Sequence, residues 1–416
     1  MFRKTLFWLH LSAGVVAGIA IFIMSLTGVL LAFERQIKGW AAASHYPVHE
    51  QGATLLTLEQ LVAVQHERQP DVQASQLVLS SKPSEPVSFR AGRRGGLDLD
   101  PYTGAQVDTA TPGVDGFFRT VENFHRWLNV EGEHRDTARA IMDGANGVFL
   151  FILISGCYLW LPPMLKRAQL KLRVWFRRSY PSDKIRDYHW HHIFGIWMVL
   201  PLLVVVYTGA VMTYPWAANL LYTAFGAEIP AAQAGPGGPP PGAGRPAGAG
   251  VGGPGGDRGE LREQGPRPTV VDAATDVPAA TWLPLDALVQ AAVADPDSAG
   301  WNHLTVTLPQ ATAKTVQIDI DQGNGAQAQL RHTVTVDRQS GAITGRRGFA
   351  DQPLAQRLRG IARFLHTGEI LGFWGQLVAA LASFGAMMLV WTGLSLAWRR
   401  LIQPLLQPLL QADRAS

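Results

Sequence analysis

Four long apolar segments constrain the fold of this chain more than any other feature of its sequence. Each segment has few or no charged residues and can cross a hydrocarbon core of ~30 Å, which takes about 20 helical residues. They cover residues 6–33, 140–161, 189–216 and 370–398. Charged residues make up only 16% of the chain, whereas a typical soluble domain has about 25%. The sequence therefore predicts an integral membrane protein, mainly α-helical, with a core of four transmembrane helices.

The first apolar segment also resembles a secretory signal peptide, because Ala41 and Ala43 follow it in the manner of a cleavage site. Its apolar run is far longer than the ~7–15 residues of a signal-peptide core. We therefore expect a retained transmembrane helix.

The positions of the basic residues predict the orientation of the chain in the membrane. The loop 162–188 contains eight Lys and Arg residues against two Asp, and such loops remain on the cytoplasmic side. The basic residues before the first span and after the last agree with this choice. We expect a multi-pass protein of a bacterial inner (cytoplasmic) membrane with both termini cytoplasmic. A nucleic-acid patch is the weaker interpretation of the loop, and no nucleic-acid partner is expected.

The spans form an internal repeat, which relates the first two to the last two. In the first span His10 precedes Gly28 by 18 residues, and in the third span His191 precedes Gly209 by the same number. Other matching positions are Gly14 with Gly195, Thr27 with Thr208, Ser155-Gly156 with Thr392-Gly393, and Phe124-His125 with Leu365-His366. Each repeat crosses the membrane twice, so the two halves run in the same direction, related by an axis along the membrane normal.

The segments outside the membrane repeat as well. Each begins with an amphipathic helical pattern, 57–65 or 285–293, and continues through strand-like runs to a turn, 100–105 or 337–342. This order predicts a small α+β periplasmic module in each half. Residues 235–256, of which 17 are Gly or Pro, predict a flexible linker. Their GxGxxG pattern lacks the strand and the helix that a dinucleotide site requires.

These patterns divide the chain into eight parts. They are transmembrane helix 6–33, periplasmic α+β module 34–123, lead-in and helix 124–161, cytoplasmic loop 162–188, helix 189–216, periplasmic region 217–365 with the linker and the second module, lead-in and helix 366–398, and cytoplasmic tail 399–416.

Four histidines lie near the ends of the apolar spans, where ionisable residues are costly and indicate function. His10 and His191 lie near the cytoplasmic ends, and His125 and His366 near the periplasmic ends. The repeat allows each pair to meet on the axis from opposite sides, and two opposed imidazoles are the axial ligands of a b-type haem. A single cysteine, Cys157, excludes the CxxCH attachment of a c-type haem. We predict two b-type haems with these histidines as iron ligands.

Other interpretations of these histidines remain open. Each could be a hydrogen-bonded packing residue, and His189 or His192 could replace His191 or complete a zinc site, which needs three or four ligands. The glycine four residues after His10 and after His191 lies on the same helix face and would leave room for a flat macrocycle, which favours His191.

Arginines flank the outer histidines. Arg126 and Arg363, together with Arg119 and Arg359, are candidates to bind haem propionates through charge-assisted hydrogen bonds. Ordinary anchoring at the membrane interface is the alternative.

The combined motifs resemble those of PepSY-associated transmembrane proteins, and among them the ferric-siderophore reductases of Gram-negative bacteria. The resemblance rests on Leu9-His10, Phe124-His125-Arg126, Ser155-Gly156 through Trp160, His191-His192-Ile193-Phe194-Gly195, Tyr214-Pro215-Trp216, His366-Thr367-Gly368 and Thr392-Gly393 through Arg400. It implies four core helices, two periplasmic PepSY-type modules, and haems that carry electrons to periplasmic ferric siderophores. Some members carry a fused flavin domain, for which these cytoplasmic segments have no room, so a separate donor is expected: a quinol or a cytoplasmic reductase.

The sequence thus favours a haem-dependent oxidoreductase that reduces ferric siderophores and releases ferrous iron. The alternative is a non-enzymatic PepSY membrane protein that acts in partner docking, protease inhibition or iron uptake. A zinc-dependent membrane enzyme is a third, weaker option. No Ser/His/Asp order, HExxH, P-loop or EF-hand motif occurs, so hydrolase and nucleotide-dependent functions have little support.

Overall fold

The structure is a computed structural model that describes residues 1–50, 52–92, 96–161, 173–228 and 282–406. The linker 235–256 and part of the basic loop, 162–172, lie outside the described residues.

The chain forms two compact units. The helical unit comprises Met1–Glu34, Gly116–Gly255 and Ile361–Ser416, and the sheet unit comprises Arg35–Asp115 and Gly256–Gly360.

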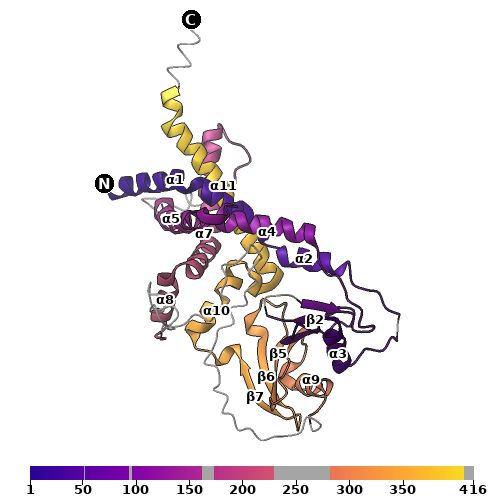
Figure 1. The fold of residues 1–416 in the computed structure, drawn as a ribbon. Coiled ribbons are helices and arrows are strands. Elements are labelled where there is room, and N and C mark those ends of the chain that lie inside the picture. The colour runs from indigo at the N-terminus through magenta and orange to yellow at the C-terminus, as the bar shows by residue number, and fades with distance from the viewer. Residues whose placement is uncertain (51, 93–95, 162–172, 229–281, 407–416) are drawn as a thin grey trace. The chain divides into compact units, whose positions relative to one another are not determined.

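Among the described residues, four helices are long and apolar enough to cross a membrane, as the sequence predicts. They are α1 (Phe2–Leu31), α5 (Arg135–Trp160), α7 (Asp183–Thr213) and α11 (Gly372–Leu401), and Figure 1 shows their crossing within the helical unit. Helix α1 packs on α5 and α11, and α7 packs on the same two helices, so the four form a ring. Apolar runs fold in this way because a helix satisfies its own backbone hydrogen bonds in hydrocarbon.

Small residues allow these helices to approach one another closely. Ala17, Ala145, Ala382 and Ala386 are buried at the centre of the ring, where they pack among larger side chains such as Phe149. Large apolar side chains cover the outside, among them Val16, Leu200 and Trp391. The ring is therefore apolar on both sides, as a bilayer requires.

A shorter amphipathic helix precedes the second span of each repeat. These helices are α4 (Pro112–Trp127) and α10 (Leu354–His366), and each carries a candidate histidine in its last turn. After α10 the chain turns at Gly368, whose φ is +76°. A Cβ at Gly375 would collide with the Gly368 carbonyl oxygen, so two glycines allow the start of α11 to fold against this turn. Two further described helices are α2 (Glu34–Ala43), in the same candidate span as α1, and α8 (Pro215–Ala224), after α7.

The described strands of the sheet unit form one antiparallel sheet. In spatial order the strands are β3 (Gly96–Leu99), β2 (Val87–Arg90), β1 (Gln76–Ser80), β4 (His303–Thr307), β5 (Thr315–Asp321), β6 (Arg331–Asp337) and β7 (Ile343–Gly348). Helices α3 (Leu58–Arg68) and α9 (Leu285–Val293) cover one face of it (Figure 1). Alternate strand residues such as Leu77, Val306 and Ile318 point into the core beneath these helices.

Both exterior segments contribute to this sheet, because β1 pairs with β4 in antiparallel register, with Val78 opposite Thr305. The sequence patterns identified a helix and strands in each segment. They did not predict that the two segments would pair edge to edge, which protects two strand edges that separate modules would expose.

The predicted turns have the same geometry in both segments. The Asp100 backbone N–H donates to Ala105, and the Gly104 N–H donates back to Asp100; Asp337 makes the same pair of bonds with Ala342 and Gly341. Both glycines have a positive φ, +66° and +70°. Equal hydrogen bonds at equal positions support the duplication.

A pair of acidic side chains joins the two repeats of the sheet unit. The Leu58 backbone N–H at the start of α3 donates to the Asp286 carboxylate, and the Leu285 N–H at the start of α9 donates to Glu59. Each repeat thus caps the helix of the other. Burial, together with a hydrogen bond to Asp286, raises the pKa of the Glu59 carboxyl.

This raised pKa predicts that stability falls as the pH rises. The folded protein holds the Glu59 proton more tightly than the unfolded chain, so the stabilisation is complete in acid and is lost as the pH rises through the folded-state pKa. Glu59→Gln keeps an acceptor for the Leu285 N–H and cannot ionise. We expect its melting temperature to match the wild type at about pH 4 and to exceed it at about pH 8, measured by thermal unfolding. Glu67→Gln, on the exposed end of α3, is the control, and a gain from Glu59→Gln that is equal at both pH values would contradict the assignment.

Candidate functional site

Each of the four candidate histidines faces a hydroxyl side chain on a neighbouring helix of the helical unit. The distances from the ring nitrogen Nδ1 to the hydroxyl oxygen are 2.8 Å for His10 and Ser155, 2.9 Å for His125 and Thr27, 3.0 Å for His191 and Thr392, and 3.4 Å for His366 and Thr208. One contact thus recurs four times, at positions that the repeat relates to one another.

A glycine follows every one of these hydroxyl residues and lies against the same histidine ring. A Cβ added at the glycine would approach the Cε1 atom of the ring: 3.3 Å for Gly156 and His10, 3.3 Å for Gly393 and His191, 3.4 Å for Gly209 and His366, and 3.8 Å for Gly28 and His125. The absence of a side chain therefore lets each ring lie close to the helix. A Cβ at Gly14 would meet no atom within 4 Å, whereas one at Gly195 would lie 3.8 Å from Leu389.

The hydroxyl hydrogens determine which ring nitrogen carries a proton. Each hydroxyl donates its only hydrogen to a carbonyl of its own helix: Thr27 to Ile23, Ser155 to Ile152, Thr208 to Val204 and Thr392 to Met388. The hydroxyl oxygen is then left to accept a bond from Nδ1–H. The lone pair of each imidazole therefore lies on Nε2, as in metal-binding histidines whose other nitrogen donates a hydrogen bond.

The structure brings His125 and His366 together from the two repeats. Their ring centroids lie 6.3 Å apart, with 70° between the ring planes. A metal–nitrogen bond of ~2 Å and a ring radius of ~1 Å would place the centroids of two opposed ligands about 6 Å apart. The spacing thus fits a pair of axial ligands. His10 is likewise among the electrostatic neighbours of His191.

The two pairs lie at different depths in the ring of helices. His10 and Thr27 are 17 residues apart on α1, as are His191 and Thr208 on α7, a rise of about 26 Å at 1.5 Å per residue. Helices α1 and α7 therefore each carry a histidine of one pair and a hydroxyl partner of the other, and the two pairs are separated by most of the thickness of a bilayer.

The other two histidines of the 189–192 cluster make different contacts. His189 Nδ1 lies 3.0 Å from the Tyr180 hydroxyl, and His192 Nδ1 donates to the Tyr188 carbonyl on its own helix, at 2.8 Å. Only His191 of the three adopts the arrangement that His10, His125 and His366 share. Among the described residues no group of three or more His, Cys, Asp or Glu side chains could hold a metal ion, so nothing there favours the zinc alternative.

The candidate arginines differ in their partners. Arg126 pairs with Glu122 at 3.0 Å and lies over the Trp127 ring, and Arg363 is half-buried. Arg119 is exposed. Arg359 has two buried nitrogens, Nε and Nη1, without a hydrogen-bond partner among the described residues. It lies on α10 two turns before His366, so an anionic group at that face of the helix would satisfy it.

A buried carboxylate near His191 was not recognised as a site residue from the sequence. Asp187, counted there as a loop charge, lies one turn before His191 on α7 with its side chain 3% exposed. It accepts a hydrogen bond from Ser395 at 2.7 Å and pairs with Arg399 at 3.2 Å, both near the end of α11, and with Arg186 on its own helix. Asp187 thus fastens α7 to α11 beside the His191–Thr392 contact. The sequence signal that could have identified Asp187 was its position next to the apolar segment 189–216, where a carboxylate is costly.

The hydroxyl residues are the second group whose role the sequence did not reveal. The sequence showed them as repeated Thr-Gly and Ser-Gly pairs, but it could not show which histidine each would face, because the contacts join different helices.

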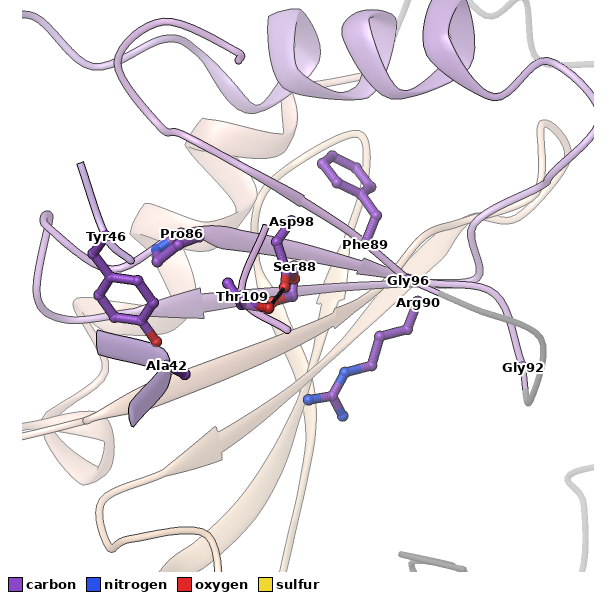
Figure 2. A pocket seen from close by; sticks show the side chains of 10 residues that line it. All are labelled: Ala42, Tyr46, Pro86, Ser88, Phe89, Arg90, Gly92, Gly96, Asp98 and Thr109. Carbon is purple, nitrogen blue, oxygen red and sulfur yellow. Dashed lines mark hydrogen bonds between the residues drawn. The ribbon is translucent and has the colours of Figure 1, made fainter. Parts of the chain in front are cut away.

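The sheet unit contains a cavity of about 550 Å³ on the face of β2 and β3 opposite α3, within the ~300–1,000 Å³ range of small-molecule sites. Figure 2 shows Ser88, Asp98 and Thr109 meeting in it, with Tyr46 on one side and Arg90 on the other. The Asp98 carboxylate accepts hydrogen bonds from Ser88 at 2.6 Å and from Thr109 at 2.5 Å. Burial and the Glu85 and Asp98 carboxylates raise the pKa of the Tyr46 phenol, which keeps it a hydrogen-bond donor.

We expect Asp187→Asn to destabilise the helical unit by about 3 kcal/mol, because it leaves two guanidinium groups without their shared carboxylate. The partial exposure of Arg186 and Arg399 places this value at the low end for a broken buried pair. Thermal unfolding of the purified protein would measure the change. The control is Asp183→Asn, which removes an exposed acid that also pairs with Arg186; equal melting temperatures for the two variants would contradict the role of Asp187.

Comparison with known proteins gives one result that bears on this arrangement. A search of curated proteins returns no match. The family model described as "PepSY-associated TM region" matches residues 7–400, a range that contains all four histidines and their hydroxyl partners. This membrane protein therefore belongs to the PepSY-associated TM region family.

Proposed function

We propose that this protein is a two-haem electron-transfer protein of the bacterial inner membrane that reduces ferric siderophores outside the cytoplasm. The observation that carries the proposal is the set of four imidazoles, two from each repeat, that present Nε2 lone pairs at two depths of the membrane. His10 and His191 would hold the inner haem, and His125 and His366 the outer one. Bound haem would supply one-electron oxidation and reduction.

The chain supplies the geometry for this function. The hydroxyl partners orient the four rings, and the glycines beside them allow each ring to lie close to the neighbouring helix. Arg359 and Arg363 on α10, with Arg126 on α4, would bind propionates by charge-assisted hydrogen bonds. The basic loop favours a cytoplasmic side for His10 and His191, so electrons would enter there from a separate donor, a quinol or a cytoplasmic reductase.

The acceptor would be a ferric siderophore. One electron converts its ferric ion to the ferrous ion, which oxygen ligands hold less tightly, and the metal is released. We propose that the cavity of the sheet unit binds the chelate, since it offers a carboxylate, three hydroxyl groups and Arg90 in one space of suitable volume.

A visible spectrum tests the cofactor directly. We expect protein purified from haem-replete cells to show the Soret and α bands of b-type haem, with two haems per chain. His10→Ala and His191→Ala should each remove the same haem, and His125→Ala and His366→Ala the other, so that every variant retains about half of the haem content. His66→Ala, on the exposed surface of α3, is the control. Wild-type protein without these bands would end the proposal and leave the non-enzymatic role.

The cavity is tested by the kinetics of acceptor reduction. Protein reduced with dithionite and freed of excess reductant is mixed with a ferric trihydroxamate chelate, and reoxidation is followed in the visible spectrum. We expect Asp98→Asn to raise the chelate concentration for half-maximal rate about tenfold, the effect of losing one charged hydrogen bond, with haem content unchanged. The matched control is Asp319→Asn, since Asp319 accepts a bond from Thr333 at 2.6 Å elsewhere on the sheet. Equal kinetics for the two variants would exclude the cavity as the chelate site.

A further inference from the structure

We propose that the hydroxyl groups of Ser155, Thr27 and Thr392 are positioning residues that tune the iron affinity of His10, His125 and His191, and that Thr208 does not play this part for His366. This inference rests on the proposed function, since it concerns the same four histidines. It assigns the control of the reduction potential to specific hydroxyl groups of the neighbouring helices.

The contact between hydroxyl and histidine ring is short at Thr27 and at Thr392. At Thr27 and Thr392 the hydroxyl donates to its own helix over 2.6 Å and accepts from a histidine Nδ1–H at 2.9 and 3.0 Å. A hydroxyl whose hydrogen is already donated is a better acceptor, because hydrogen bonds in a chain polarise one another. The ring is therefore held in one tautomer, and its Nε2 becomes more basic.

The contact between Thr208 and His366 is longer than the other three. The His366 Nδ1–H donates to the Val205 carbonyl at 2.8 Å, while the Thr208 hydroxyl lies 3.4 Å away. The backbone carbonyl thus takes over the acceptor role that the hydroxyl has at the other three histidines. A carbonyl three residues before the hydroxyl residue also lies beside each of the other rings, so loss of a hydroxyl leaves another acceptor beside the ring and the ring is not released.

The basicity of an imidazole changes the reduction potential of an iron that it would hold. A more basic imidazole stabilises ferric iron more than ferrous iron, because the ferric ion carries the higher charge. Removing the hydroxyl should therefore raise the midpoint potential of the haem concerned. A second-shell change typically alters metal affinity about 10–100-fold, and a tenfold change in the ratio of ferric to ferrous affinity corresponds to about 59 mV for one electron.

The experiment is a spectroelectrochemical titration of the full-length haem-loaded protein. Thr27→Val and Thr392→Val remove the hydroxyl while they preserve the shape of the side chain, Thr27→Ser and Thr392→Ser restore it, and Thr208→Val is the built-in control. We expect an upward shift of about 59 mV for one haem in each of the first two variants, wild-type potentials in both serine variants, and a clearly smaller shift in Thr208→Val. Loss of a haem in a valine variant with retention in its serine counterpart also supports the inference, since only the hydroxyl separates the two.

Other results would overturn the inference. Wild-type potentials and full haem content in Thr27→Val and Thr392→Val would show that the hydroxyls have no such role, and an equal shift in Thr208→Val would show that the distance difference has no effect. In both cases the proposed function would stand, because two haems would still be bound. Wild-type protein that binds no haem would overturn both.

Discussion

The hydrogen bond from a histidine ring to a hydroxyl on the next helix is the interaction on which the arrangement in the membrane depends. An imidazole in an apolar surrounding needs a partner for its N–H group, because an unpaired polar group there is costly. A serine or threonine in a transmembrane helix can accept this bond because its own hydrogen is donated to a carbonyl of its helix. The same interaction satisfies the N–H group, fixes the tautomer and leaves the lone pair of the ring on Nε2.

Glycine is the necessary companion of that hydroxyl. A Cβ on the residue after each hydroxyl would lie 3.3–3.8 Å from the ring, and the contact would be tightest at Gly156 and Gly393. The Thr-Gly and Ser-Gly pairs therefore form one unit of structure: the first residue supplies an acceptor and the second supplies space. Because the unit occurs once in each of the four spans, each of the four histidines lies beside a hydroxyl residue and a glycine.

The duplication also explains the exterior sheet, although the repeats have diverged. The segments pair through β1 and β4, and the acids Glu59 and Asp286 cap each other's helices. Elsewhere the repeats differ. Asp187 fastens α7 to α11 in the second repeat, where the first has an apolar leucine, Leu6, at the corresponding place before its histidine. His366 relies on a backbone carbonyl where His125 uses a hydroxyl. Two sites built from the same parts can thus acquire different properties.

The sequence alone determined the four spans, the internal repeat and the helices at 57–65 and 285–293, because these depend on patterns along the chain. Hydropathy sets the spans, since only helices satisfy the backbone in lipid, and equal spacings reveal a repeat. Contacts between distant segments were decided by the tertiary structure. Thr27 faces His125 across 98 positions of sequence, and Thr392 faces His191 across 201, so no local pattern could pair them. The shared sheet and the burial of Asp187 likewise depend on which surfaces meet after folding, and that is a property of packing in three dimensions.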